Sequence, residues 1–83
     1  MKISIRYFAS IREAVGSGSE LAETSAQSIG ALRAELITRG GAFAQALAPG
    51  KSVRASLDKV MADDAALLRE GCEVGFFPPV TGG

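Results

Sequence analysis

The last eight residues constrain the fold of this chain more than any other segment does. Two phenylalanines end an apolar run, Pro78 and Pro79 follow, and the chain stops at two glycines. Proline lacks the N–H group that a sheet ladder needs, and it favours extended backbone in the residue before it. A final strand is therefore expected to end at Phe77, and residues 78–83 are expected to leave the domain as a semi-rigid tail.

The tail ends in Gly82 and Gly83, which have no side chains. Such an end can enter a narrow channel in another protein and bring the terminal carboxylate to a reactive centre. A carboxylate is a poor electrophile, but adenylation turns it into an acyl phosphate that a sulfur or nitrogen nucleophile can attack. The carboxylate of Gly83 is therefore the candidate reactive group, although many chain termini are simply floppy.

The composition describes one small domain whose side chains offer little catalytic chemistry. Nine basic residues balance nine acidic ones with no run of either sign, so no footprint for nucleic acid or an anionic membrane is visible. With no histidine and only Cys72, an internal disulfide, a Cys/His zinc site and a histidine-activated nucleophile are excluded. No stretch resembles a membrane span or a signal peptide, so a cytoplasmic protein is expected.

Alternating hydrophobicity predicts a first strand over residues 2–8. In this strand Ile3, Ile5 and Tyr7 share the face that is expected to point into the core. Further strands are expected over residues 20–24, 53–57, 60–62 and 73–77, with a hairpin turn at Asp58 and Lys59.

The main helix is expected to begin after Ser28, a plausible N-cap, and to run to about residue 39. Ile29, Leu32 and Leu36 fall at helical spacing and form its buried stripe. The charged residues of this helix, Arg33, Glu35 and Arg39, are expected on its solvated faces.

Shorter helical segments are expected on either side of the main helix. Ser10 and Glu13 fit a capping box, which predicts a short helix ending at Gly16. One further helical turn is expected over residues 43–47, and another over residues 65–68.

These elements follow in the order strand, strand, helix, strand, strand, strand. The pattern predicts an α+β domain with a mixed sheet of about five strands, one main helix on one face and short extra helical turns. Residues 1–83 form a single domain in this interpretation, and one helix leaves the other face of the sheet partly open.

Three large apolar residues are expected on that open face. Period-2 alternation places Phe8 and Phe77 opposite the core-facing residues of their strands, and Met61 joins them if Val60 points inward. The three side chains form either a docking patch or the scattered apolar exposure that is common on protein surfaces.

Several stretches together indicate a family. Residues 3–9 read ISIRYFA, residues 11–13 read IRE, ALR stands at 31–33, and EV at 73–74 leads into FFPPVTGG. With these stretches the whole chain resembles the small subunits of molybdopterin synthase, the MoaD family of ubiquitin-like sulfur carriers. The ending is the specific part of this resemblance.

The resemblance implies a β-grasp fold, with the first and last strands paired in parallel at the centre of the sheet. It also implies that an adenylyltransferase of the ubiquitin-activating type uses ATP and magnesium to adenylate Gly83, and that a sulfur donor leaves a thiocarboxylate there. The large synthase subunit then accepts the tail, in an expected heterotetramer of two small and two large subunits. The sulfur passes to a cyclic pterin precursor, and the chain itself binds no cofactor or metal.

The resemblance assigns roles to residues as well. Gly82 and Gly83 form the reactive end, and Cys72 takes a position at which this family more often has an acidic residue. No histidine or adjacent cation activates that cysteine, so it is expected to be inert. Arg12 is either a partner contact near the tail or a solvated helix charge. The expected partner-binding residues are Phe8, Arg12, Met61, Phe77, Pro78, Pro79, Val80 and Thr81.

Three alternatives remain open. The chain is a sulfur carrier for another pathway such as thiazole or cysteine synthesis, a ubiquitin-like modifier that is joined to lysines, or a plain β-grasp interaction module. The stem of the tail, residues 76–80 with the sequence FFPPV, favours a sulfur carrier for molybdopterin synthesis over these alternatives. A thiocarboxylate, a ladder of conjugates or neither would distinguish these classes.

Overall fold

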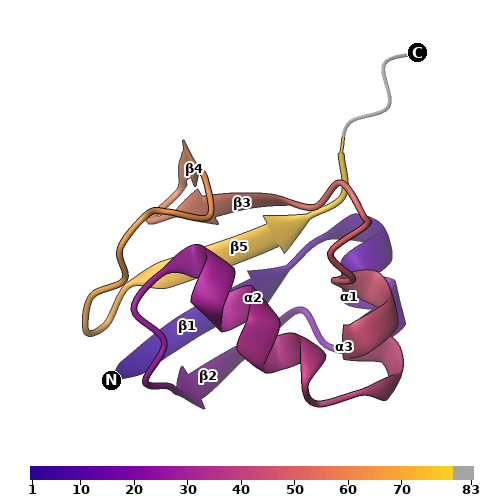
Figure 1. Ribbon diagram of the computed structural model, residues 1–83, viewed down its shortest axis with the longest axis horizontal. Helices are drawn as coiled ribbons and strands as arrows, with labels where there is room; N and C mark the ends of the chain where they lie inside the picture. The colour runs from indigo at the N-terminus through magenta and orange to yellow at the C-terminus, as the bar shows by residue number, and fades with distance from the viewer. Residues whose placement is uncertain (80–83) are drawn as a thin grey trace.

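The computed structural model describes residues 1–79 and shows a five-stranded sheet with helices packed on one side of it (Figure 1). The elements are β1 (Lys2–Tyr7), α1 (Ala9–Val15), β2 (Ser19–Glu23), α2 (Ile29–Ile37), α3 (Gly41–Ala46), β3 (Arg54–Leu57), β4 (Val60–Ala62) and β5 (Glu73–Phe77).

The first and last strands form a parallel pair inside the sheet. The strand order is β2-β1-β5-β3-β4, and all pairs other than β1–β5 are antiparallel. A parallel pair needs a long crossover, and the segment between β1 and β5 supplies it with all three helices. This confirms the α+β class and the β-grasp arrangement that the resemblance implied.

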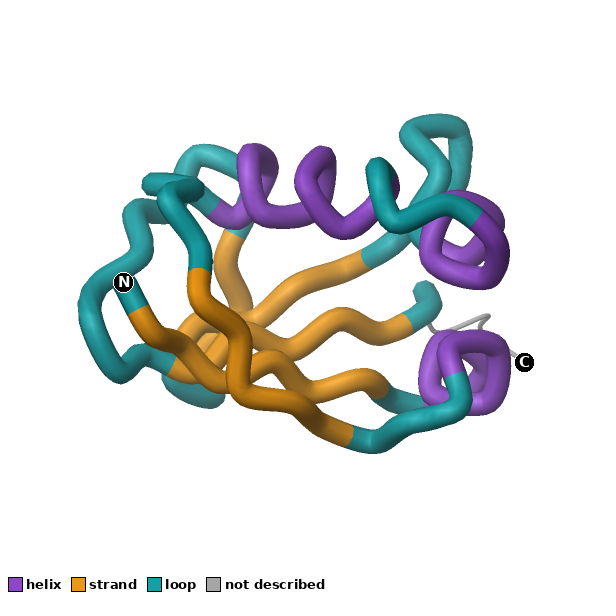
Figure 2. The backbone as a smooth tube through the Cα atoms, turned by 90° about the horizontal axis from the view of Figure 1, so that it is seen from below, coloured by secondary structure: helices purple, strands orange, loops and turns teal. Residues whose placement is uncertain are grey.

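Figure 2 shows the helices lying over one face of the sheet. The buried side chains of the strands and of α2 form one hydrophobic core between these layers. The alternation in β1 is confirmed because its three inward side chains are all buried, and the stripe of α2 is buried as well. Removing these apolar groups from water supplies most of the favourable free energy of folding. The fully buried large side chains are Ile3, Ile5, Tyr7, Ile29, Leu32, Leu36, Leu47, Val74 and Phe76.

The two predicted helix starts had different outcomes. Ser28 is the N-cap of α2, and its hydroxyl accepts a hydrogen bond from the Ala31 N–H at 3.1 Å. The capping box at Ser10 is wrong, because α1 begins two residues earlier, with Phe8 at the N-cap and no side-chain cap. The Phe8 N–H donates to the Phe76 carbonyl at 3.1 Å, so the ladder between β1 and β5 extends to the first turn of α1 and sets where it starts.

The helical turn expected over residues 65–68 is also wrong. Leu67 forms an isolated antiparallel bridge with Ser28. The Leu68 N–H donates to the Gln27 carbonyl at 2.9 Å, and the Ala66 carbonyl accepts from the Ile29 N–H at 3.1 Å. The Ala66 carbonyl and the Leu68 N–H thus pair with the residues around the start of α2, and the segment forms no helix.

The expected turn at Asp58 and Lys59 is confirmed. Both residues have positive φ angles, 49° and 70°, as the tight turn of a two-residue hairpin requires. The Asp58 carboxylate accepts a hydrogen bond from the Glu73 N–H at 2.9 Å and pairs with Arg69 at 3.1 Å. These contacts attach the hairpin to the start of β5. Val60 faces the helix side with Leu57, but it stays exposed on the edge strand.

The remaining helical predictions hold with shifted ends. α2 ends at Ile37, about two residues earlier than expected, and Thr38 is its C-cap. The further helical turn expected over residues 43–47 is α3. None of the helices in residues 1–79 has the length and apolar character that crossing a bilayer requires.

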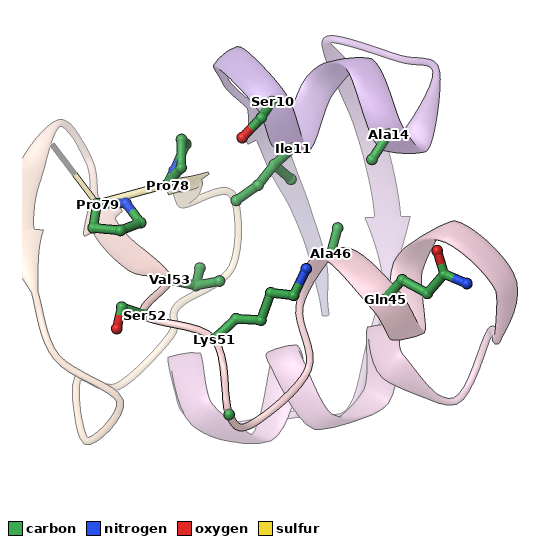
Figure 3. A pocket seen from close by; sticks show the side chains of 11 residues that line it. Ser10, Ile11, Ala14, Gln45, Ala46, Lys51, Ser52, Val53, Pro78 and Pro79 are labelled. Atoms are coloured by element: carbon green, nitrogen blue, oxygen red, sulfur yellow. The ribbon is translucent and has the colours of Figure 1, made fainter. Parts of the chain in front are cut away.

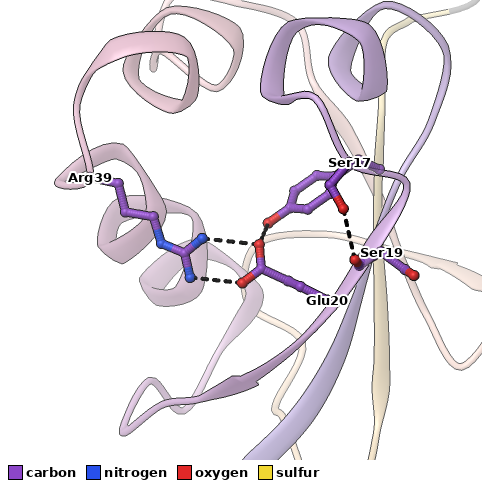
Figure 4. Close-up of polar contacts among 5 residues, drawn as sticks. Ser17, Ser19, Glu20 and Arg39 are labelled. Atoms are coloured by element: carbon purple, nitrogen blue, oxygen red, sulfur yellow. Dashed lines mark hydrogen bonds and ion pairs between the residues drawn. The ribbon is translucent and has the colours of Figure 1, made fainter.

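A polar cluster joins β1, β2 and the segment after α2 (Figure 4). The Arg39 guanidinium makes two hydrogen bonds of 3.0 Å to the Glu20 carboxylate, and the Tyr7 hydroxyl donates to the same carboxylate at 2.8 Å. The hydrogen bonds from Arg39 lower the pKa of Glu20 below its usual value. Burial, followed by the contact with Glu20, raises the pKa of Tyr7. Arg39 is exposed, as expected, but its guanidinium is held against β2 by the Glu20 carboxylate.

The cluster predicts a pH-dependent stability. Because the pKa of Glu20 is lowered in the folded state, its ion pair stabilises the fold above the ordinary pKa of glutamate and loses this effect as the pH falls through the folded value. Glu20→Gln is expected to melt earlier than wild type at pH 7, and the difference should shrink as the pH falls below the ordinary pKa of glutamate. Thermal melts across this range measure it. Glu23→Gln, on the same strand, is the control, and an equal effect of both changes at every pH would contradict the prediction.

Candidate functional site

The tail begins at the end of a central strand. β5 lies between β1 and β3, and its Phe76 is fully buried while Phe77 and Pro78 are half-buried. Figure 1 shows the chain leaving the sheet beside the end of β1, at the side where α1 begins. The position of the tail's root is therefore set by backbone pairing to the first strand.

The structure brings Phe8, Met61 and Phe77 together on the face of the sheet that α2 leaves open. They line one shallow hollow, and the rings of Phe8 and Phe77 meet edge to face with 6.1 Å between their centroids. Phe8 is 40% exposed and Met61 is 55% exposed, so this surface is accessible. The expected geometry of this open-face patch is confirmed, and its role in binding stays a prediction.

Gly75 makes the patch possible, although it was not among the expected site residues. A Cβ atom at this position would lie 2.6 Å from the Ser56 Oγ and 3.1 Å from Cε2 of Phe8. The Phe8 ring therefore reaches across β5 only because residue 75 has no side chain. Glycine inside a predicted strand is a known signal of close approach, so this feature was accessible from the sequence.

Two cationic side chains and one acidic side chain lie at the rim of the open-face patch. The Arg6 guanidinium lies 5.5 Å from the centre of the Phe8 ring, within the range of a cation–π contact. Arg6 and Lys59 both line the hollow, whereas Glu73 is the one acidic residue among its described lining residues. The patch therefore presents apolar side chains with a mainly cationic rim.

A second hollow lies at the root of the tail on the helix side of the sheet (Figure 3). α1 and α3 pack against each other beside it, and the loop that leads into β3 forms another wall. We call it the tail-root groove. The lining residues that define it here are Ile11, Ala14, Ala46, Lys51, Val53, Pro78 and Pro79.

Arg33 fixes the loop that forms one wall of this groove. Its Nε donates to the Leu47 carbonyl at 2.8 Å, and its Nη2 donates to the carbonyls of Ala48 and Lys51 at 2.7 and 3.0 Å. Arg33 was expected on a solvated face. Its role carries no sequence signal, because the three acceptors are main-chain atoms fourteen to eighteen residues away.

The other expected site residues within residues 1–79 are not among those that line the patch. Arg12 is exposed on α1, with its side chain alongside Gly18 and not among the residues that line the patch or the groove. Cys72 is buried and free. Pro79 is exposed and lines the groove beside Pro78. Val80, Thr81, Gly82 and Gly83 lie outside the described residues, so their expected roles stay predictions.

No group of three or more His, Cys, Asp or Glu side chains within residues 1–79 is arranged to hold a metal ion. What the described residues provide is a fixed exit point for a main chain, with an apolar patch on one side and a groove on the other. This arrangement can orient a terminal carboxylate towards another protein.

Comparisons with known proteins agree with this description. A family model described as the ThiS family matches residues 5–83. The molybdopterin synthase sulfur carrier subunit of Escherichia coli strain K12 is 36% identical over 81 residues, which are 98% of this chain and 99% of that protein.

Two solved structures share the fold. Small archaeal modifier protein 1 from Methanosarcina acetivorans matches with a TM-score of 0.78 at 20% identity, covering 99% of this chain and 96% of that one. A protein–protein complex of subunits 1 and 2 of the molybdopterin-converting factor from Helicobacter pylori contains a chain that matches with a TM-score of 0.69 at 23% identity, covering all of both chains.

The close packing around Gly75 predicts that any side chain at this position lowers the folding stability. Gly75→Ala is expected to destabilise the fold by about 1–3 kcal/mol, because the new methyl group displaces Ser56 or Phe8. Denaturant unfolding measures this loss. In a Ser56→Ala background the loss should be smaller, since the nearest obstructing atom is gone.

Gly50→Ala is the control for this measurement, because a Cβ atom at Gly50 meets nothing within 4 Å. Equal effects of the changes at Gly75 and Gly50 would show that the close approach of Phe8 to β5 does not constrain the patch.

Proposed function

The chain belongs to the ThiS family, and on this basis we propose that it is the sulfur carrier subunit of a molybdopterin synthase. The observation that carries the proposal is the ending FFPPVTGG, whose two phenylalanines finish a strand inside the sheet and whose last two residues have no side chains. The similarity to a protein of that name along nearly the whole chain supports the choice among sulfur-carrier pathways.

The proposed chemistry takes place at the main-chain terminus. A partner adenylyltransferase of the ubiquitin-activating type uses ATP and magnesium to join the Gly83 carboxylate to AMP, releasing pyrophosphate. A sulfur donor then displaces AMP and leaves a C-terminal thiocarboxylate. Cys72 has no part in this scheme, since its side chain is buried in the core and the carrier needs no side-chain nucleophile.

The large synthase subunit is the proposed acceptor of the loaded tail. There the thiocarboxylate gives its sulfur to a cyclic pterin precursor. Each carrier has one terminus and the molybdopterin dithiolene has two sulfurs, so each product requires two deliveries. We propose an assembly of two small and two large subunits, and the cytoplasmic location expected from the sequence remains part of this proposal.

The described residues contribute position rather than catalysis. Pro78 and Pro79 restrict the backbone of the stem, and the open-face patch lies directly beside the root of the tail. A partner that binds the patch therefore receives the terminus at a defined distance and direction, which is the main requirement for a carrier.

A ubiquitin-like modifier is the second candidate, favoured by the shared fold with small archaeal modifier protein 1. Sulfur carriers of other pathways are a third. Mass spectrometry of the protein isolated from cells distinguishes the first two. A carrier shows one oxygen exchanged for sulfur at the C-terminus, whereas a modifier shows conjugates with lysines of other proteins.

The first test concerns the terminus. One alanine added after Gly83 is expected to abolish thiocarboxylate formation, because the carboxylate then lies beyond the adenylation centre and its residue carries a side chain. Molybdopterin formation in a reconstituted assay measures the effect, and the melting temperature should not change. Wild-type rates from the extended chain would contradict the proposal.

The second test concerns the patch. Phe77→Ala is expected to weaken binding to the large subunit about 30-fold, since aromatic anchors often contribute about 2 kcal/mol to an interface. Its folding stability should fall far less than that of Phe76→Ala, which removes a fully buried ring and is expected to lose about 3–5 kcal/mol. Calorimetric titration and thermal melts measure the two effects. A Phe77→Ala protein that is as unstable as Phe76→Ala yet binds normally would show that Phe77 is a core residue.

A further inference from the structure

We propose that the tail-root groove is a second docking site for the large synthase subunit, where Lys51 pairs with a carboxylate carried on an apolar segment of that partner. The inference rests on the proposed function and adds a surface that the sequence analysis did not identify. It concerns the helix side of the tail root, whereas the open-face patch lies on the other side of the sheet.

The walls of the groove are mostly apolar. Ile11 and Ala14 contribute from α1, Ala46 contributes from α3, and Val53 contributes from the loop before β3. No acidic residue lines it among the residues that the structure describes. An apolar segment of a partner would therefore bury these side chains without leaving an acidic group unpaired.

Lys51 is the one charged residue among the groove's described lining residues, and its side chain extends into the groove (Figure 3). The ion pairs within residues 1–79 are Arg39–Glu20 and Arg69–Asp58, so the Lys51 ammonium is not neutralised by any acid in this part of the chain. A single cation between apolar walls suits a single carboxylate, whereas phosphate sites gather several donors.

The backbone of Lys51 is already fixed before any partner binds. Its carbonyl accepts from Arg33 at 3.0 Å and from the Val53 N–H at 2.9 Å, and its own N–H donates to the Ala48 carbonyl at 2.9 Å. A preorganised residue loses less conformational entropy on binding than one in a mobile loop. Arg33 is therefore a positioning residue for this groove.

The groove is continuous with the tail. Pro78 and Pro79 line it, and they are also the first residues of the stem that the partner must accept. A partner that binds both the open-face patch and the groove contacts the root of the tail on both sides of the sheet. Two contacts define the direction of the stem, whereas the patch alone would allow the domain to pivot about one surface.

The test uses the full-length chain and the purified large subunit. Lys51→Met keeps the length of the side chain and removes its charge, and Lys51→Glu reverses the charge. Lys2→Glu is the control, because Lys2 is exposed at the start of β1, at the opposite end of the parallel pair from the tail root. Titration calorimetry at low and high salt gives the affinity, and thermal melts confirm that each variant is folded.

Lys51→Met is expected to weaken binding about tenfold at low salt, and Lys51→Glu about a hundredfold, because it places like charges together. The difference between wild type and Lys51→Met should shrink at high salt, since the contact is electrostatic. Lys2→Glu should bind like wild type.

Two results would overturn the inference while leaving the proposed function intact. The first is wild-type affinity of both Lys51 variants for the large subunit. The second is a defect of the Lys51 variants that is confined to adenylation, which would assign the groove to the activating partner. If the wild-type chain itself does not bind the large subunit, the proposed function fails instead.

Discussion

The parallel pairing of β1 with β5 is the constraint on which the rest of the molecule depends. It runs from Ser4 opposite Glu73 to Tyr7 opposite Phe76, and β5 is held between β1 on one side and β3 on the other. The pairing also explains why all helices lie in the connection between the two strands. Because loop closure precedes such long-range pairing, the tail has a defined root only in the folded domain.

One face of β5 packs into the core, and the other face forms part of the proposed partner-binding surface. Val74 and Phe76 are buried among the core side chains, while Gly75 and Phe77 face the open side. Gly75 contributes no side chain to that surface and so lets Phe8 reach across the strand. A five-residue strand thereby supports the core with one face and builds the open-face patch with the other.

The sequence predicted those features that depend on local pattern. Alternation identified β1, helical spacing identified the buried stripe of α2, and Ser28 was recognised as a cap because it bonds to its own first turn. The errors share a physical cause. Ser10 was a plausible cap and residues 65–68 a plausible turn, but pairing with distant backbone groups satisfied the same atoms in another way.

The same reasoning explains what was found and missed at the site. Phe8 and Phe77 were placed correctly because strand alternation decides which face a residue occupies. The tail-root groove was missed because α1, α3 and the loop before β3 come together only in the tertiary structure. Arg33 was misjudged for the same reason, since its acceptors are main-chain carbonyls that carry no sequence signal.

A carrier whose reactive group is its own terminus needs a different design from an enzyme. An enzyme fixes its side chains around a substrate, whereas this fold must fix where its main chain leaves the domain. The central strand anchors that point, Phe77 and Pro78 are half-buried next to it, and Pro79 continues with a restricted backbone. Phe77 and Pro78 thus lose little conformational freedom when a partner accepts the tail, so that more of the contact energy from the patch and the groove remains for binding.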